Sequence, residues 1–196
     1  MPRRPTRTVP TVILHGLDGN GPDHWQAWLA TQLREQGREV REPSLPNAAA
    51  PELEAWLGVL RTTLEGLPDD GFDVVAHSLA SILWLHHASA PGGSPRPARV
   101  ALIAPPAPDR TLEQCPSFFP APLDVDAVRA AADGTVLVGS DNDPYNPAGT
   151  AATYGYPLKM AVSLMPGAGH INDEAGFGEW PAVLDWCGRD NLAFIV

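Results

Sequence analysis

The sequence contains few cysteines. Cys115 and Cys187 are the only two among its 196 residues, and no CxxC pair occurs. Two isolated cysteines build no disulfide framework and form no structural zinc site, so we expect both to be reduced thiols. The histidines are not accompanied by an HExxH motif or a cluster with carboxylates, and we therefore expect no metal site.

Long apolar runs and nucleotide-binding glycine motifs are also missing. The first apolar run, residues 9–14, is interrupted by Pro10 and is far shorter than the roughly 20 residues of a membrane span. Neither a GxGxxG motif nor a P-loop motif occurs, so the usual signals for dinucleotide or nucleotide triphosphate binding are absent. We expect a cytoplasmic protein that needs no cofactor and does not act at a membrane.

Basic residues are outnumbered by acidic ones. Thirteen Lys and Arg stand against 23 Asp and Glu, and the formal charge is −10. Such a surface repels phosphate, so nucleic acid is not an expected partner. We expect a small-molecule substrate as the partner, while no pattern identifies a protein partner. From the chain length, we expect a flexible tail over residues 1–8 and a single domain over residues 9–196.

Short apolar runs of strand length alternate with helical patterns along the chain. Continuous apolar runs are typical of strands that are buried on both faces. Alternation with helices favours a parallel sheet. The predicted fold class is α/β, a mostly parallel sheet with helices on both faces. The predicted strand segments, taken in chain order as the first to the sixth run, span residues 11–14, 38–42, 72–76, 99–104, 135–139 and 160–165; the segment 38–42 is a weaker strand candidate and is not apolar.

Polar residues at the ends of these runs are where chemistry is expected, because ligands of parallel sheets bind beyond the carboxyl ends of the strands. Before the second run, Asp23 is expected to cap a helix, with Gln26 at the capping-box spacing. His15-Gly16 follows the first run, and a tight turn there can bring the Leu17 amide toward a reacting oxygen.

A candidate nucleophile follows the third run, in the segment Ala76-His77-Ser78-Leu79-Ala80. A serine on a strained strand-to-helix turn leaves no room for large residues two positions away, and both positions hold alanine. We predict that Ser78 is the nucleophile and that the Leu79 amide, at the start of the helix, is one oxyanion donor. The Leu17 amide is predicted to be the second donor.

An aspartate and a histidine follow Ser78 in chain order. Either Asp141 or Asp143 could hold a histidine in the required tautomer. We favour Asp143 because Pro144 follows it, whereas Asp141 could instead cap the turn. His170, after a glycine-rich turn, is the predicted general base. The structural alternatives are two solvated loop carboxylates and a loop histidine that hydrogen-bonds to the backbone.

Several segments together resemble the small serine hydrolases of the α/β-hydrolase superfamily that include retinoblastoma-binding protein nine. The most specific is Gly169-His170-Ile171-Asn172 with Gly-Phe-Gly-Glu-Trp-Pro at 176–181. The resemblance implies Ser78, His170 and Asp143 as the triad, on a minimal α/β-hydrolase fold without a large lid domain. Ala80 departs from the glycine of many members. The other segments that carry the resemblance are His15-Gly16, His24-Trp25 with Trp28, residues 76–79 and Asp143-Pro144-Tyr145.

The predicted function is a serine hydrolase that cleaves small carboxylic esters or related acyl compounds through an acyl-enzyme on Ser78. The chain leaves little length for a cap, so a shallow site is expected. Two alternatives remain: an amidase or peptidase, and a binding or scaffold protein with an idle triad, because fold does not determine function. Residues predicted to contact the substrate are His15, Phe118, Phe119, Tyr145, Phe177 and Trp180.

Overall fold

A six-stranded sheet runs through the computed structural model, which describes residues 7–90, 92, 94–190 and 192–194. Its strand order is β2-β1-β3-β4-β5-β6, and every neighbouring pair is parallel. Each predicted run overlaps one strand, so the prediction of a parallel α/β sheet is confirmed. The strands are β1 Thr11–Leu14, β2 Val40–Arg41, β3 Asp73–His77, β4 Arg99–Ile103, β5 Gly134–Ser140 and β6 Val162–Met165.

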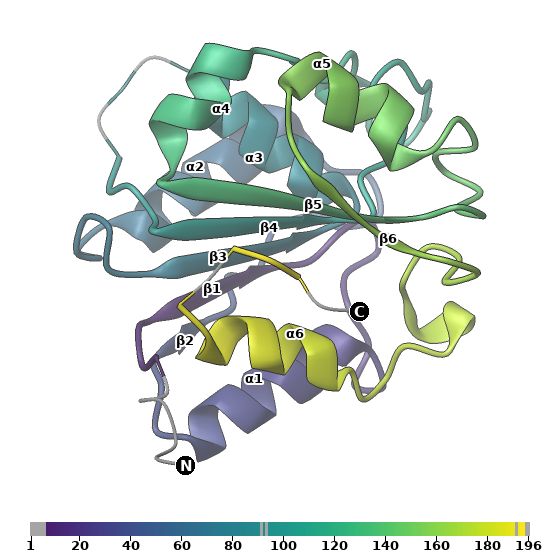
Figure 1. Ribbon diagram of the computed structural model, residues 1–196. Helices are drawn as coiled ribbons and strands as arrows, with labels where there is room; N and C mark the ends of the chain where they lie inside the picture. The colour runs from purple at the N-terminus through teal and green to yellow at the C-terminus, as the bar shows by residue number, and fades with distance from the viewer. Residues whose placement is uncertain (1–6, 91, 93, 191, 195–196) are drawn as a thin grey trace.

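Helices cover both faces of the sheet, as predicted (Figure 1). Helices α2, α3, α4 and α5 lie on one face, and α1 and α6 lie on the other. The described part of the connection from β4 to α4 holds only the 3₁₀ turn Pro116–Phe118 and no large lid. The helices are α1 Trp25–Glu35, α2 Leu53–Leu64, α3 Leu79–Ser89, α4 Val125–Ala131, α5 Tyr156–Leu158 and α6 Pro181–Gly188.

Successive side chains of each central strand pack into two different cores. In β1, Val12 belongs to the core that contains Trp56 of α2, whereas Ile13 belongs to the core that contains Trp25 of α1. Side chains of a strand alternate between its two faces, and here both faces are covered. Most positions of such a strand are therefore apolar, which explains the apolar runs in the sequence, and the buried charge of Asp73 is paired with Arg99.

The order of the strands reverses at β1, because β2 and β3 lie on opposite sides of it. At such a point the two connections leave the carboxyl ends of neighbouring strands in opposite directions and open a crevice between them. Gly16 and Leu17 follow β1, and Ser78 follows β3. The topology therefore brings these residues to one crevice at the carboxyl edge.

The start of α1 corrects the predicted cap. His24, not Asp23, is the N-cap residue, and its Nδ1 accepts a hydrogen bond from the Gln26 amide at 3.2 Å. Gln26 is fully buried and its Nε2 donates to the Leu14 carbonyl at 2.8 Å, so it takes no part in a capping box. The buried carbonyl at the end of β1 needs a donor, and this demand overrides the local capping pattern.

The predicted N-terminal tail is described only in part, since residues 1–6 lie outside the described residues. The Arg7 guanidinium lies 3.2 Å from the buried Asp73 carboxylate, and the Arg7 amide donates to the Gly188 carbonyl at 3.3 Å. Arg99 also binds Asp73, at 2.5 Å. The division into a tail over residues 1–8 and one domain over residues 9–196 stays a prediction.

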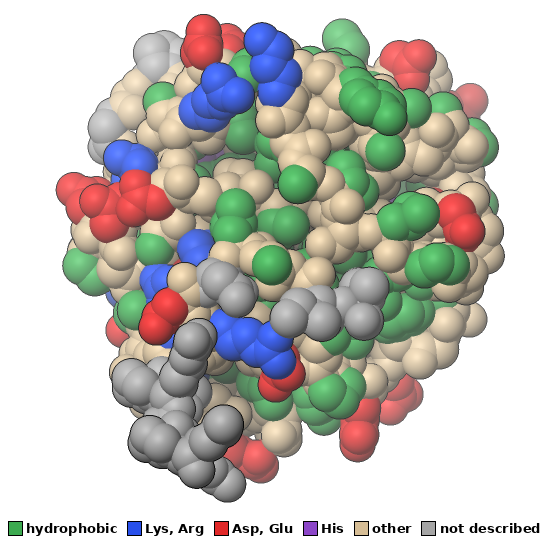
Figure 2. All heavy atoms as spheres, in the orientation of Figure 1, with side chains coloured by type: hydrophobic (Ala, Val, Ile, Leu, Met, Phe, Trp, Pro, Cys, Tyr) green, Lys and Arg blue, Asp and Glu red, His purple; other side chains and the backbone are tan. Residues whose placement is uncertain are grey.

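The face of the molecule over edge strand β6 has apolar side chains in its middle and charged side chains toward its periphery (Figure 2). Leu164 of β6 is 46% exposed there. Across the described ranges, none of the helices combines the length and apolarity that a membrane span requires.

Gly139 in β5 lies where a side chain would collide with a neighbour. A Cβ atom built on it would be 2.1 Å from Thr150 Oγ1 and 2.6 Å from Thr150 Cβ. We expect Gly139→Ala to lower the free energy of unfolding by about 1–3 kcal/mol, as measured by urea denaturation, because overpacking displaces neighbours. In the matched control Gly58→Ala, the added methyl group meets nothing within 4 Å on α2. The free energy of unfolding of this variant should therefore rise by about 0.5–1 kcal/mol. Unchanged stability of Gly139→Ala would contradict this.

Candidate active site

Ser78 occupies the sharp turn between β3 and α3. Its φ of 54° and ψ of −123° are angles that residues other than glycine rarely adopt. The Ser78 amide donates to the Ile103 carbonyl at 2.8 Å, which ties the turn to the end of β4. Ala80, two positions after the serine, is fully buried, so this position has no room for a large side chain. The strand, turn and helix expected around this serine are all present.

Three of the predicted site residues come together at the carboxyl edge. His170 Nε2 lies 2.8 Å from Ser78 Oγ, and His170 Nδ1 lies 3.0 and 2.9 Å from the two carboxylate oxygens of Asp143. A carboxylate accepts here, so we assign the ring proton to Nδ1, and Nε2 is left to accept from the serine hydroxyl. The three residues are at most 8% exposed, so the chain of hydrogen bonds is shielded from water.

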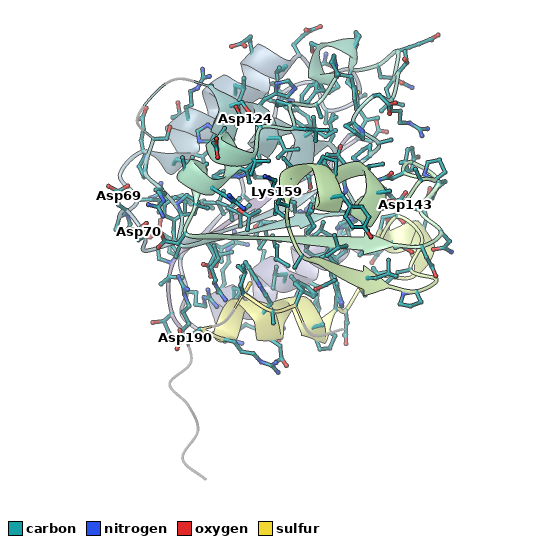
Figure 3. The ribbon with its side chains drawn as sticks, turned by 45° about the horizontal axis from the view of Figure 1, so that its top comes forward. Asp69, Asp70, Asp124, Asp143, Lys159 and Asp190 are labelled. Atoms are coloured by element: carbon teal, nitrogen blue, oxygen red, sulfur yellow. The ribbon has the colours of Figure 1, made fainter. Side chains whose placement is uncertain are left out.

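The alternative acid, Asp141, does not contact the imidazole. Its Oδ1 accepts a hydrogen bond from the Gly167 amide at 2.7 Å. Asp143 lies at the carboxyl end of the sheet, whereas Asp69 and Asp70 lie at the opposite end (Figure 3). Of the two carboxylates that the sequence left open, Asp143 is therefore the one paired with the histidine.

Two backbone amides beside Ser78 have no acceptor within the described residues. Leu79 is the first residue of α3, where the helix offers its amide no carbonyl. The Leu17 amide follows Gly16, at which a built Cβ would be 2.8 Å from Ser78 Cβ. Only glycine allows this loop to approach the serine so closely. Both amides are those predicted as oxyanion donors.

A cavity of about 280 Å³ opens beside Ser78. Its apolar lining consists of Leu17, Leu79, Pro106, Leu112 and Tyr145, and its polar lining includes Asp18, Asn20, His24, Asn172, Asp173 and Glu174. The described lining thus carries three carboxylates and neither lysine nor arginine. Such a lining repels ligands that bear a carboxylate.

Of the residues predicted to contact the substrate, Tyr145 lines this cavity, with its ring 4.4 Å from that of His170. Phe118 does not, because it is fully buried with its ring 5.3 Å from that of Trp56. Phe119 lines a separate hollow on the segment between β4 and α4. An aromatic side chain near a strand exit is therefore a poor guide to the cavity wall.

The other three predicted contacts also lie away from the cavity. Trp180 is 5% exposed and packs in the core beneath α1, and the Phe177 ring lies 5.4 Å from it. His15 accepts a hydrogen bond from the Leu45 amide at 3.4 Å, and its ring lies 5.6 Å from that of Trp56. His15 thus fixes the shape of the loop after β1.

Two histidines beside the cavity are kept neutral by burial. Burial lowers the pKa of His24 to about 4, partly offset by the nearby Asp173 carboxylate. Burial lowers the pKa of His77 well below its usual value of 6.5, and the neighbouring His170 lowers it further. Neither histidine therefore offsets the carboxylates at neutral pH. In the described part of the chain, no group of three His, Cys, Asp or Glu side chains could hold a metal ion.

Sequence reasoning missed most of the polar wall. Asn172 and Asp173 lie two and three residues after His170, and Asp18 and Asn20 follow the first strand. The rule that ligands bind beyond strand exits could have found these four, since they lie within a few residues of exits already identified. His24 belongs to a segment that carries the family resemblance, but only its position at the start of α1 shows that it lines the wall.

The geometry agrees with a comparison against family models. A model described as serine hydrolase matches residues 11–188, a range that includes Ser78, Asp143 and His170. The chain belongs to the serine hydrolase family. This confirms the resemblance inferred from the sequence motifs and makes the protein a hydrolase.

Similar proteins are found in both sequence and structure. This hydrolase is 26% identical over 184 residues to YdeN of Bacillus subtilis (strain 168), with 91% of this chain and 94% of that one covered. The crystal structure of the B. subtilis ydeN product matches with a TM-score of 0.80 at 23% identity, over 91% and 96% of the two chains.

Two further structures share the fold. A YdeN-like protein from Pectobacterium atrosepticum SCRI1043 has a TM-score of 0.69 at 23% identity, over 91% of this chain and 89% of that one. The thioesterase domain from the curacin biosynthetic pathway has a TM-score of 0.64 at 15% identity, over 92% and 91%. At these identities the likeness shows the α/β-hydrolase fold and not a shared substrate.

We expect acid to destabilise the protein between pH 6.5 and pH 4. Unfolded His24 binds a proton near its usual pKa of 6.5, but folded His24 does so only at about 4. In this window the unfolded state binds more protons, so the free energy of unfolding falls with falling pH. Urea denaturation at several pH values measures the slope. His24→Asn should make it shallower while keeping an N-cap side chain, and an unchanged slope in that variant would contradict the assignment.

Proposed function

We propose that this hydrolase cleaves small carboxylic esters or related acyl compounds, with Ser78 as nucleophile. The observation that carries the proposal is the 2.8 Å contact between Ser78 Oγ and His170 Nε2, with Asp143 on the other ring nitrogen. His170 takes the hydroxyl proton as Oγ attacks the carbonyl carbon. Asp143 keeps the ring in the required tautomer and stabilises the imidazolium that forms.

The Leu17 and Leu79 amides are proposed to bind the carbonyl oxygen as it gains negative charge. In other serine hydrolases, removal of one such donor destabilises the transition state by roughly 2.7–4 kcal/mol. The tetrahedral intermediate then collapses, His170 donates its proton to the leaving oxygen, and an acyl group remains on Ser78. Water, deprotonated by His170, attacks this ester and releases the acid. No step in this sequence requires a cofactor.

The cavity supports small substrates that carry no carboxylate. Its volume of about 280 Å³ leaves room for a short acyl group, and its carboxylate lining disfavours anions. Structural neighbours named as a thioesterase domain and as an esterase domain, the latter from Rhodothermus marinus, also fit acyl chemistry. A cytoplasmic location and a small-molecule partner, with neither nucleic acid nor membrane, remain predictions from sequence.

Labelling with a fluorophosphonate probe tests the proposal. We expect the intact mass to rise by one probe per chain in the wild type and not in Ser78→Ala, because the probe reacts only with an activated serine. Ser44→Ala removes an exposed serine and should label like the wild type. Folded wild-type protein that does not label would overturn the proposal and favour an idle scaffold.

Turnover of p-nitrophenyl esters but not of matching anilides would separate an esterase from an amidase.

The two neighbouring aspartates make a matched pair for testing the acid. In Asp143→Asn, the new side-chain amide no longer favours the His170 tautomer with its proton on Nδ1, so kcat should fall by about 10⁴-fold, as in serine proteases. Asp141→Asn keeps the oxygen that accepts from the Gly167 amide, so kcat should fall only a few-fold. Ester hydrolysis under saturating substrate measures both, and equal losses in the two variants would refute the assignment.

A further inference from the structure

Three consecutive side chains after β5 each place an oxygen on the loop that carries His170. Asp141 Oδ1 accepts from the Gly167 amide at 2.7 Å, Asn142 Oδ1 accepts from the Gly169 amide at 2.7 Å, and Asp143 binds the imidazole itself. The acid loop and the base loop are thus joined at three successive points. Only the last of these touches a reacting group.

The opposite side of the same loop is held by two buried rings. His77 Nε2 donates to the His170 carbonyl at 3.0 Å, and Trp25 Nε1 donates to the Ile171 carbonyl at 2.8 Å. His77 directly precedes Ser78, so one residue of the serine turn holds the backbone of the histidine. The backbone on both sides of the imidazole is therefore anchored.

The loop has little regular structure of its own to keep its shape. Gly167, Gly169 and Ile171 have φ values of 72°, 55° and 51°, all in the left-handed region, which no helix or strand contains. The Gly167 and Gly169 amides take side-chain acceptors in place of backbone carbonyls. The position of His170 therefore depends on the anchors that surround this turn.

Asn142 joins the loop to the end of β5. Its Oδ1 accepts from Ser140 Oγ at 2.6 Å as well as from the Gly169 amide. Ser140 is the last residue of β5 and is 1% exposed, whereas Asn142 is exposed. A single oxygen thus links a rigid strand end to the residue before His170, and the side chain that bears it lies outside the core.

We propose that Asn142 and Asp141 are positioning residues that set the imidazole of His170 between Ser78 and Asp143. The inference rests on the proposed function and adds two residues that touch neither substrate nor reacting atoms. A displacement of about 1 Å at a reacting group can cost up to about 100-fold in rate. Loss of an anchor at an exposed side chain should therefore slow the reaction far more than it weakens the fold.

Alanine and isosteric variants at both positions test the inference. Asn142→Asp and Asp141→Asn keep the accepting oxygen and change the charge in opposite directions, whereas Asn142→Ala and Asp141→Ala remove the oxygen. We expect the alanine variants to lower kcat and the rate of fluorophosphonate labelling by about 10- to 100-fold. We expect KM and the melting temperature to stay close to wild type, and both isosteric variants to recover most of the rate.

The control is Glu113→Ala, which removes another exposed side chain, on the segment between β4 and α4, and should keep wild-type rates. Wild-type labelling with undiminished rates in both alanine variants would overturn the inference and leave the proposed function standing. Isosteric variants as slow as the alanine variants would also overturn it, because the oxygen contacts would then not be the cause. A wild type that never labels would remove the proposed function and this inference with it.

Discussion

The hydrogen bond between Ser78 Oγ and His170 Nε2 joins residues 92 positions apart in the chain, and the proposed chemistry depends on it. The three residues of the proposed triad follow three different strands: Ser78 follows β3, Asp143 follows β5 and His170 follows β6. These exits meet at one edge only because all the strands are parallel. The distance between oxygen and nitrogen is then adjusted by loop contacts, since the sheet alone places strand ends and not side chains.

Rigid surroundings maintain a strained centre. Ser78 has a φ of 54°, which is unfavourable for a serine. The strand before it is buried on both faces, the helix after it is buried over most of its length, and its amide is bonded to Ile103. Packing energy from both cores therefore holds the serine turn in place. The close approach of Gly16 adds a second constraint, because a methyl group there would displace the serine side chain.

Burial also shapes the electrostatics of the reaction. Ring centroids of His77 and His170 lie 5.2 Å apart, and those of His24 and His77 lie 5.0 Å apart. If either neighbour were protonated, its charge would oppose the imidazolium that the proposed mechanism forms on His170. Burial lowers the pKa of His24 to about 4 and that of His77 well below 6.5, so both neighbouring rings are neutral at neutral pH.

The strands, the serine turn and the order of serine, aspartate and histidine could all be read from the sequence. A strand buried on both faces needs an uninterrupted apolar run, and a tight turn needs small residues around Ser78, so both leave local patterns. The cavity wall leaves no such pattern: Phe118 and Trp180 entered the core, and His24 entered the wall. The sequence favoured Asp143 over Asp141, but which carboxylate contacts the imidazole, and how residues 167–171 are anchored, depend on which distant segments meet at the edge of the sheet, and only the tertiary structure decides that.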